Sequence, residues 1–414
     1  MGSAQNKVVA LFGGAFNPVH NGHIYIVEKY KEQFPDSLVI WMPSFLSAHK
    51  SNIDLTSDLH RVNLVKKILQ KRPTLGILST LEISKKSTSY TIDTVRALKA
   101  IYPDTKIHVV IGDDLVNTLS SWKEFDSLAK EVTFVVASRG SSNIEDFDKN
   151  IIGSGAFVFL KNSRLEISST AVRFSLATGN LDSSHLPPYV KKYIYKKGLY
   201  RGAAKTHNAI KKAYNFMVKN LSLARLSHCQ QVALTAKALA QKYGVSQLLA
   251  YQAGFFHDIA RELSDKKITC YATKFRHLQK RLWDKEASCK LSYKVGDQNI
   301  KPIIFHGEAG GYILWRCGFI DKDFLEAICL HTFFLLGSSA LAAIIFLADY
   351  LEPTRNFDTS TLWEETKSST LGEMVQKVSS AMMDYDKKCG RKTFLETKLL
   401  AEAKESDIIC ENRS

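Results

Sequence analysis

The sequence predicts a doubly wound parallel α/β sheet in the first half of the chain and an all-α domain in the second. Up to about residue 201, short apolar runs rich in β-branched residues alternate with amphipathic stretches of helical spacing. This pattern is typical of strand–helix–strand units around a parallel sheet. Beyond that point the strand signals stop and the helical periodicity continues. A chain of 414 residues is longer than a domain with a single hydrophobic core usually is. We therefore predict two domains, residues 1–202 and 203–414.

Six apolar runs are expected to form the strands. In order they cover residues 7–14, 38–43, 75–83, 106–112, 131–138 and 156–161. Residues 58–71 and 91–102, which lie between these runs, have helical spacing. In the second half, helices are expected over 209–221, 225–244, 246–263 and 324–336. Parallel sheets of this kind bind ligands at the carboxyl ends of their strands, so we look there for a site.

Composition narrows the class of protein without choosing one function. The net charge of +15 favours anionic partners, among which nucleotides, nucleic acid and membrane surfaces all qualify. The seven scattered cysteines form no C-x-x-C pair, which favours free thiols in a reducing compartment, the cytoplasm. The N-terminus lacks the apolar core and cleavage site of a signal peptide, so we read residues 7–14 as a buried strand. The uncharged run 333–348 is short for a membrane span and is broken at 337–339, which favours a buried helix pair.

The first candidate site is the stretch "GGAFNPVHNGH", residues 13–23. Gly13 and Gly14 end the first predicted strand and leave its backbone open to a ligand. A helix is expected after Gly22, so His20 and His23 would lie at a helix N-terminus, where anions bind. A nucleotide-phosphate site and a plain surface turn both fit. A zinc site would need further ligands, and this half of the chain has no cysteine.

Two motifs of the first half resemble those of the H-x-G-H nucleotidyltransferase superfamily, whose domain is Rossmann-like. They are "GGAFNPVHNGH" and "ISSTAVR", residues 167–173. The resemblance implies that a phosphate oxygen attacks the α-phosphorus of ATP and releases pyrophosphate, with Mg²⁺ bridging the leaving group. It implies that His20 and His23 contact the ATP phosphates. With Arg173, which would hold the β- and γ-phosphates, these histidines are the catalytic residues that the resemblance implies. The nucleotide-binding positions it implies are Gly13, Gly14, Phe16, Ser168 and Ser169.

Further segments narrow the resemblance to nicotinate-nucleotide adenylyltransferases, over roughly residues 7–200. "STSYTIDTVRALK" (87–99) and "IGDDLVNTLSSWKEF" (111–125) are similar to segments of that family, in which the tryptophan lies against the pyridine ring. "PSFLSAHK" (43–50) is similar to a loop near the substrate phosphate. The substrate-binding candidates are Lys50, Tyr90, Thr91, Asp93, Gly112, Asp113, Trp122 and Arg139. The residues do not separate nicotinate mononucleotide from its amide.

The second candidate site is a dispersed set of histidines and aspartates in the helical half. In order it comprises His228, His257, Asp258, His306, His331 and Asp349. A buried histidine beside an aspartate is more often structural, but four imidazoles and two carboxylates suit transition metals. If residues 331–349 formed one straight helix, its ends would lie about 27 Å apart at 1.5 Å per residue. A shared metal cluster therefore requires a chain reversal, which Gly337, Ser338 and Ser339 supply.

The ordered set resembles the HD-domain metallophosphohydrolases, over about residues 205–360. "HDIARELS", "HGEAGGYIL" and "ADYLEPTR" are similar to the symmetrical diadenosine tetraphosphatases of bacteria. This resemblance implies two metals, Fe or Mn, held by the six residues, with Asp258 also catalytic, and hydrolysis of diadenosine tetraphosphate to two ADP. Arg225, Lys266 and Arg355 are the basic candidates for the phosphate chain. Where the family often has H-T-T-G, this chain has "HTFFLLG", which leaves the dinucleotide open.

Together these observations predict a bifunctional enzyme whose partners are ATP, nicotinate mononucleotide and diadenosine tetraphosphate. In one alternative the HD half acts on another phosphoester or senses nucleotides without turnover. In a second, the chain is a basic RNA-binding protein, but the expected interleaving of basic and aromatic residues is not found. We expect no membrane and no specific nucleic acid as partner, and a homo-oligomer remains open.

Overall fold

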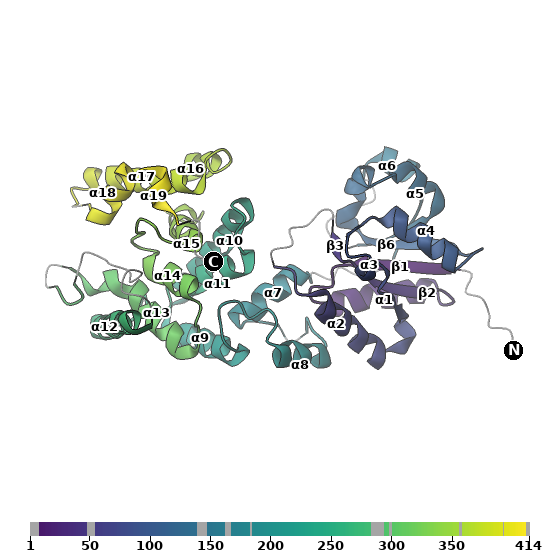
Figure 1. The fold of residues 1–414 in the computed structure, drawn as a ribbon, viewed down its shortest axis with the longest axis horizontal. Helices are drawn as coiled ribbons and strands as arrows, with labels where there is room; N and C mark the ends of the chain where they lie inside the picture. Colours follow the sequence, from purple (N-terminus) through teal and green to yellow (C-terminus); the bar gives the residue numbers. More distant parts are fainter. Residues whose placement is uncertain are drawn as a thin grey trace. The chain divides into compact units, whose positions relative to one another are not determined.

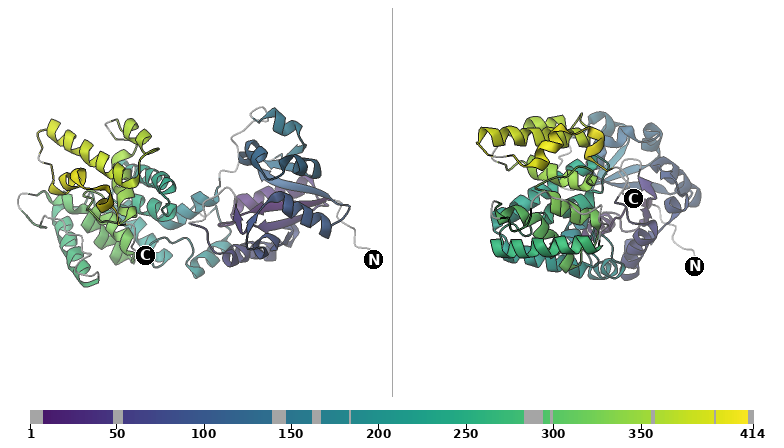
Figure 2. Two further views of the ribbon diagram at one scale, coloured as in Figure 1. Left: turned by 45° about the horizontal axis from the view of Figure 1, so that its top comes forward. Right: turned by 60° about the vertical axis from the view of Figure 1, so that its left-hand side comes forward.

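The computed structural model describes residues 8–47, 54–138, 147–161, 167–182, 184–282, 294–297, 300–355, 358–391 and 393–410. The chain divides into two compact units (Figures 1 and 2). Unit 1 comprises Met1–Arg173 and Leu181–Leu199, and unit 2 comprises Phe174–Asn180 and Tyr200–Ser414. The division falls within helix α7 (Ser169–Thr178), a detail that the sequence did not indicate.

Unit 1 is built on a six-stranded sheet in the order β4-β2-β1-β6-β7-β8. The strands are β1 (Val8–Gly14), β2 (Leu38–Pro43), β4 (Ile77–Leu78), β6 (Lys106–Gly112), β7 (Thr133–Ala137) and β8 (Ala156–Phe159). Every neighbouring pair is parallel. The chain moves outward from β1 in one direction and then, from β6, in the other, so the order reverses between these two strands. The predicted doubly wound sheet is confirmed, and its switch point lies at the carboxyl end of β1.

Helices connect these strands (Figure 1). They are α1 (Asn21–Gln33), α2 (Asp58–Lys71), α3 (Leu81–Ser84), α4 (Thr91–Ile101), α5 (Phe125–Glu131) and α6 (Lys149–Gly153), with 3₁₀ helices at Pro73–Leu75 and Asp113–Ser121. Helix α8 (Pro188–Lys197) follows the last strand. A short pair, β3 (Leu46–Ser47) with β5 (Thr88–Ser89), lies outside the main sheet. The prediction of one strand over 75–83 was wrong in part. Only β4 is extended there, because the Ser79 hydroxyl accepts the Leu81 N–H at 3.3 Å and α3 begins.

One buried titratable group interrupts the apolar interior of the sheet. His108 of β6 is 6% exposed, its Nδ1 lies 3.0 Å from the Tyr30 hydroxyl, and the Phe34 ring packs edge-on against it. Burial and the charge of Lys106 lower the pKa of His108 below its usual 6.5. The folded unit therefore holds this ring neutral where the unfolded chain would take up a proton.

We expect the free energy of unfolding of unit 1 to fall between about pH 7 and pH 5, because the unfolded chain binds the proton that folded His108 excludes. In His108→Gln this contribution is absent, so the decline with falling pH should be shallower. Scanning calorimetry of the unit 1 transition at several pH values in this window measures both slopes. Identical slopes in the two proteins would show that His108 does not contribute.

The regular secondary structure of unit 2, among its described residues, is helical apart from two isolated β-bridges, as predicted. Its helices are α9 (His207–Asn220), α10 (Leu223–Lys242), α11 (Gln247–Phe256), α12 (Asp265–Leu282), α13 (His306–Cys317), α14 (Lys322–Leu330), α15 (Ala340–Leu351), α16 (Ser360–Glu365), α17 (Leu371–Lys388), α18 (Leu395–Glu402) and α19 (Glu405–Ile408). The apolar α15 is the central helix, with residues 341–348 all buried, and it packs against α10, α11, α14 and α17. The core of unit 2 thus surrounds a helix that carries one of the candidate metal ligands.

The predicted chain reversal between His331 and Asp349 is confirmed. Helix α14 ends at Leu330, Gly337 has a φ of +70°, and Ser339 caps α15. The Glu326 carboxylate accepts the Ser339 N–H at 3.0 Å. From the other side, the Gly337 N–H donates to the carbonyls of Asp407 and Ile408, and the Cys410 N–H donates to the Ser338 carbonyl. The end of the described chain thereby holds the reversal in place.

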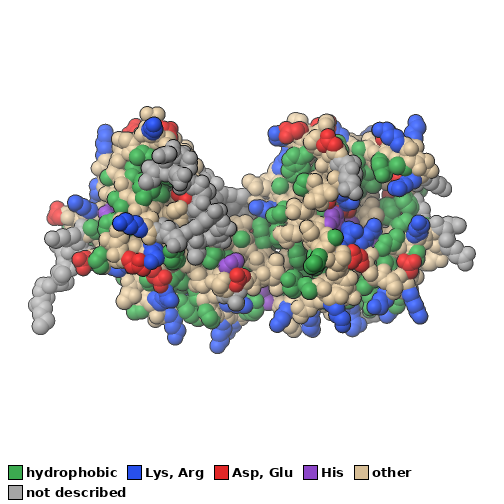
Figure 3. All heavy atoms as spheres, turned by 180° about the vertical axis from the view of Figure 1, so that it is seen from behind, with side chains coloured by type: hydrophobic (Ala, Val, Ile, Leu, Met, Phe, Trp, Pro, Cys, Tyr) green, Lys and Arg blue, Asp and Glu red, His purple; other side chains and the backbone are tan. Residues whose placement is uncertain are grey.

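None of the described helices combines the length and the apolar character needed to cross a membrane. On the face drawn in Figure 3, lysine and arginine side chains are scattered among acidic and neutral ones on both units. On this face the excess of positive charge therefore does not gather into one continuous basic surface.

Candidate functional sites

The H-x-G-H loop lies at the switch point of the unit 1 sheet. Gly13 and Gly14 end β1, and α1 begins at Asn21 with His20 as its capping residue. The His20 N–H donates to His23 Nδ1 at 3.2 Å, and the two ring centroids are 3.8 Å apart. A Cβ at Gly22 would lie 2.9 Å from the His20 ring, so only glycine leaves room for it. The motif therefore fixes two adjacent imidazoles at a helix N-terminus.

The second motif meets the first, although they lie 151 positions apart in the sequence. The Ser169 hydroxyl donates to the Pro18 carbonyl at 2.9 Å, and Arg173 Nη1 donates to the Asn17 carbonyl at 2.8 Å. At the start of α7, the Ser168 hydroxyl accepts the Ala171 N–H. Two helix N-termini and a guanidinium thus meet around one loop, an arrangement suited to a polyphosphate.

Two buried residues support this loop from behind. The Phe16 ring is 1% exposed and contacts the rings of His23 and Trp41, with a backbone φ of +47°. Arg61 of α2 is also 1% exposed and donates to the carbonyls of Ala15 and Ser44, at 2.9 and 2.6 Å. It ties the loop after β1 to the loop after β2.

The sequence analysis missed Arg61, yet a signal was present. Arg61 lies on the same helical face as Leu64, Val65 and Ile68, all of them buried. A single charged residue on an apolar helical face must find partners inside the protein, because an unpaired buried charge is costly.

The segments with the substrate candidates also come together. Tyr90 caps α4, Thr91 is its first residue, and Asp93 lies in its first turn. Lys123 joins this turn to the other segment: its Nζ lies 3.1 Å from Asp93 Oδ2 and 4.9 Å from the centre of the Tyr90 ring. Beside it, the half-buried Trp122 has an indole N–H with no partner among the described residues.

The other candidates of unit 1 follow from the strand order. Gly112 ends β6, which neighbours β1, and the buried Asp113 follows it and accepts the Ser138 hydroxyl at 3.3 Å. The β3–β5 pair brings the chain after β2 beside the segment that leads into Tyr90. Lys50 and Arg139 lie outside the described residues.

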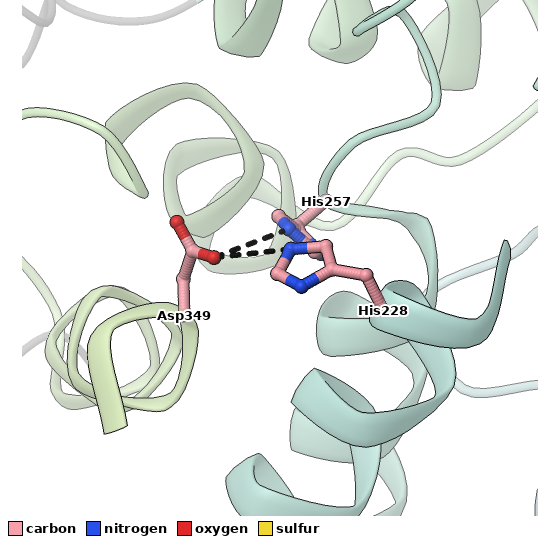
Figure 4. A group of neighbouring side chains, drawn as sticks. All are labelled: His228, His257 and Asp349. Carbon is pink, nitrogen blue, oxygen red and sulfur yellow. Dashed lines mark ion pairs between the residues drawn. The ribbon is translucent and has the colours of Figure 1, made fainter. Parts of the chain in front are cut away.

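The six HD-site candidates converge in unit 2. They come from α10 (His228), the end of α11 (His257, Asp258), the start of α13 (His306), the end of α14 (His331) and α15 (Asp349). Asp349 Oδ1 lies 3.2 Å from His228 Nε2 and 3.8 Å from His257 Nε2 (Figure 4). Asp258 Oδ1 lies 2.9 Å from His306 Nε2 and 3.5 Å from His331 Nε2. Two carboxylates thus each face a pair of imidazoles.

Hydrogen bonds set which nitrogen of each ring faces the cluster. In three histidines Nδ1 lies 2.7 Å from a carbonyl three residues earlier in the chain: His257 with Gly254, His306 with Ile303 and His331 with Ile328. Because a carbonyl only accepts, each Nδ1 carries the proton, and in the neutral ring Nε2 is then an acceptor. The Nε2 atoms of His306 and His331 nevertheless lie 2.8 Å apart. Two facing acceptors in a buried cluster repel each other unless a proton or a metal ion lies between them.

The donor set therefore fits divalent transition metals. The ligand atoms of His228, His257 and Asp349 lie within 4.8 Å of one another, as do those of His257, Asp258 and His331. Imidazoles held by a hydrogen bond on the far nitrogen are the usual form of histidine ligands. Four imidazoles and two carboxylates favour Fe, Mn or Zn over Mg²⁺.

The electrostatics prepare these groups for a metal. Burial opposes ionisation of Asp258, but the surrounding histidines outweigh it and hold the pKa of its carboxyl well below the usual range. Burial opposes ionisation of Asp349 too, yet His228 and other positive groups lower the pKa of Asp349. Burial lowers the pKa of His306 to about 4. At neutral pH the carboxylates are ionised and His306 is neutral, which are the forms that bind metal ions.

Three arginines surround the cluster. Arg225 Nη1 donates to Asp258 Oδ2 at 2.8 Å, and Arg355 donates to the carboxylate and the carbonyl of Asp349. Arg261, which the sequence analysis did not select, lies 3.2 Å from His306 Nδ1. Lys266, which it did select, is exposed on the first turn of α12, and its side chain makes no hydrogen bond or ion pair with another described residue. Arg261 therefore adds a third guanidinium close to the cluster, and the role of Lys266 stays a prediction.

Glu352 orients His228. It is 1% exposed, its Oε1 lies 3.2 Å from His228 Nδ1, and its Oε2 accepts the N–H and hydroxyl of Thr354. We expect Glu352→Gln to weaken metal binding about 10–100-fold, the usual cost of losing such an orienting carboxylate. Calorimetric titration with Mn²⁺ measures this, with the exposed Glu402→Gln on α18 as matched control. Equal affinities for the two variants would contradict the orienting role.

Comparison with known proteins finds two family models along the chain. Residues 11–174 match the cytidylyltransferase-like family and residues 225–354 match the HD domain. The chain is 31% identical over 194 residues to the nicotinate-nucleotide adenylyltransferase of Bacillus subtilis, which covers 47% of this chain and 98% of that protein. It is 28% identical over 349 residues to a Mycoplasma genitalium protein named "Probable nicotinate-nucleotide adenylyltransferase/Ap4A hydrolase", which covers 84% of this chain and 88% of that protein. The structure of Plasmodium falciparum nicotinic acid mononucleotide adenylyltransferase aligns with a TM-score of 0.41 at 24% identity, over 47% of this chain and 97% of that one.

Proposed function

This chain belongs, through its first half, to the nicotinate-nucleotide adenylyltransferase family, and on that premise we propose that unit 1 transfers the adenylyl group of ATP to nicotinate mononucleotide. The observation that carries the proposal is the meeting of the two motifs, with Ser169 and Arg173 hydrogen-bonded to the backbone beside His20. The products would be nicotinate adenine dinucleotide, a precursor of NAD, and pyrophosphate.

In this proposal catalysis rests on positioning and on positive charge. The phosphate oxygen of the mononucleotide attacks the α-phosphorus of ATP, and the bond to the β-phosphate oxygen breaks. His20 and His23 donate to the triphosphate, and Arg173, with the N-terminus of α7, neutralises the charge that develops on the leaving pyrophosphate. Mg²⁺, when bound, would add charge neutralisation on the same oxygens. Trp122 would lie against the pyridine ring, with Tyr90, Thr91 and Asp93 beside the substrate.

For unit 2 we propose hydrolysis of diadenosine tetraphosphate to two ADP. The convergence of four imidazoles and two carboxylates on one buried cluster supports this. Iron or manganese, held by the six residues, would supply an activated water. Arg225, Arg261 and Arg355 would neutralise the phosphate chain. The six described cysteines are all free, which supports a reducing compartment, the cytoplasm, for the enzyme.

Two assays on the full chain test the two proposals. Diadenosine tetraphosphate is supplied with Mn²⁺ or, without oxygen, Fe²⁺, and the products are separated by chromatography. ADP as sole product supports symmetrical hydrolysis, whereas AMP with ATP contradicts it, and no turnover with any metal would leave unit 2 as a sensor or an enzyme of another phosphoester. In parallel, ATP with Mg²⁺ is offered with nicotinate mononucleotide or its amide. Equal or greater turnover of the amide would contradict the proposed substrate.

A further inference from the structure

A cavity in unit 2 lies outside the metal cluster. Its volume is about 850 Å³. It lies between α10, the end of α15 and the beginning of α16, and its lining includes Gln231, Leu234, Thr235, Arg355, Asp358 and Trp363. Apart from Arg355, neither candidate site uses any of these residues.

Two features connect this cavity to the metal cluster. Arg355 lines the cavity and also donates to Asp349, so its guanidinium belongs to both. On α10, Gln231 and Thr235 follow His228 by three and seven positions, on the same helical face. At about 1.5 Å per residue, this face leads about 10 Å away from the metal ligand His228. The cavity therefore extends from the cluster along α10.

The side chains that line the cavity differ in chemistry from those of the metal cluster. Trp363 offers an indole face and Leu234 an apolar side chain, while Gln231 and Thr235 offer an amide and a hydroxyl. The hydrogen bonds from Ser360 lower the pKa of the Asp358 carboxyl, so the lining carries an anion as well as Arg355. A phosphate would be repelled by that carboxylate, whereas a ribose hydroxyl would donate to it. An indole face with amide and hydroxyl groups beside it suits a nucleobase.

We propose that this cavity binds the nucleoside of one half of the dinucleotide, with its base on Trp363 and its phosphates running past Arg355 to the metal cluster. The inference rests on the proposed hydrolase activity of unit 2 and deepens it by assigning the residues that recognise the base. The inference also predicts a difference between substrates, because a polyphosphate chain without a nucleoside cannot contact Trp363 and Leu234.

Kinetics on the full chain give the first test. Trp363→Ala is expected to raise KM for diadenosine tetraphosphate about tenfold or more, the usual effect of losing a stacking partner, with kcat within about twofold. Trp363→Phe should restore most of the affinity. With inorganic tripolyphosphate, which has no base, wild type and Trp363→Ala should have the same kcat/KM. An unchanged KM for the dinucleotide in Trp363→Ala would overturn the inference.

A matched pair of exposed leucines guards against effects on folding. Leu234 lines the cavity and is 44% exposed, and Leu399 on α18 is 47% exposed and lies outside it. Leu234→Glu places a negative charge in the path of the nucleotide and should raise KM, whereas Leu399→Glu should leave it unchanged. Equal effects of the two substitutions would contradict a nucleoside site.

Equilibrium dialysis with labelled ADP separates this inference from the proposed reaction. Wild type is expected to bind ADP at two sites, one in each unit, and Trp363→Ala and Leu234→Glu should each lose the same one. If the chain binds ADP in this way but hydrolyses no dinucleotide, the proposed reaction is wrong and the nucleoside site stands. If both variants bind ADP as wild type does, the nucleoside site is wrong whatever the hydrolase activity.

Discussion

Asp258→Asn is expected to lower hydrolysis of diadenosine tetraphosphate by more than about 100-fold. Loss of a residue that only orients a metal ligand costs about 10–100-fold, and loss of a ligand itself should cost more. The substitution keeps the shape of the side chain but removes the charge that faces His306 and His331. Adenylyl transfer should stay within about twofold of wild type, because the H-x-G-H loop belongs to the other unit. Both activities are measured on the same preparation, together with its content of bound metal.

The control for this variant is Asp265→Asn, on the exposed first turn of α12. It removes the same charge from the same unit without touching the cluster, so both activities should persist. If folded Asp258→Asn lost both activities, the proposal of two separate sites would be wrong.

His23→Asn is expected to lower kcat/KM for adenylyl transfer about 10²–10³-fold, the usual cost of removing a donor aimed at developing charge. The His23 ring contacts the rings of His20 and Phe16, so the substitution also removes a packing contact from His20. The rate is measured at saturating ATP, and dinucleotide hydrolysis on the same protein should be unchanged. His60→Asn, a partly buried histidine of α2 outside the motif, is the matched control. Full activity of His23→Asn would contradict the phosphate role.

Much of the fold could be predicted because its signals are local. Alternation of apolar and amphipathic runs indicates strands and helices directly, and the parallel sheet follows from their order. The reversal near Gly337 could also be predicted, since one metal cluster cannot include both ends of a straight helix. The run 75–83 was read wrongly because its apolar pattern does not reveal the turn after β4, where the Ser79 hydroxyl accepts the Leu81 N–H.

The candidate sites also contain some residues that the sequence could indicate and others that it could not. Residues in dense motifs could be chosen from the sequence, but their supports could not. Arg61 and Glu352 act through backbone and side-chain partners that only the folded chain brings near. Phe333 and Phe334, which belong to the "HTFFLLG" stretch that departs from the family pattern, pack against Phe394 and Phe346. Arg261 likewise lies near the cluster only because the chain between α11 and α12 folds against the start of α13.

The hydrogen bonds that hold the Gly337 reversal have a consequence for synthesis of the protein. The segment that clamps the reversal, residues 407–410, is made last among the described residues, whereas the six candidate ligands are complete once Asp349 has been made. On the ribosome, the growing chain therefore carries every ligand before it can hold His331 and Asp349 in register. Metal capture in unit 2 should consequently wait until residues 407–410 have been made, whereas the strands of the unit 1 sheet are complete by residue 159.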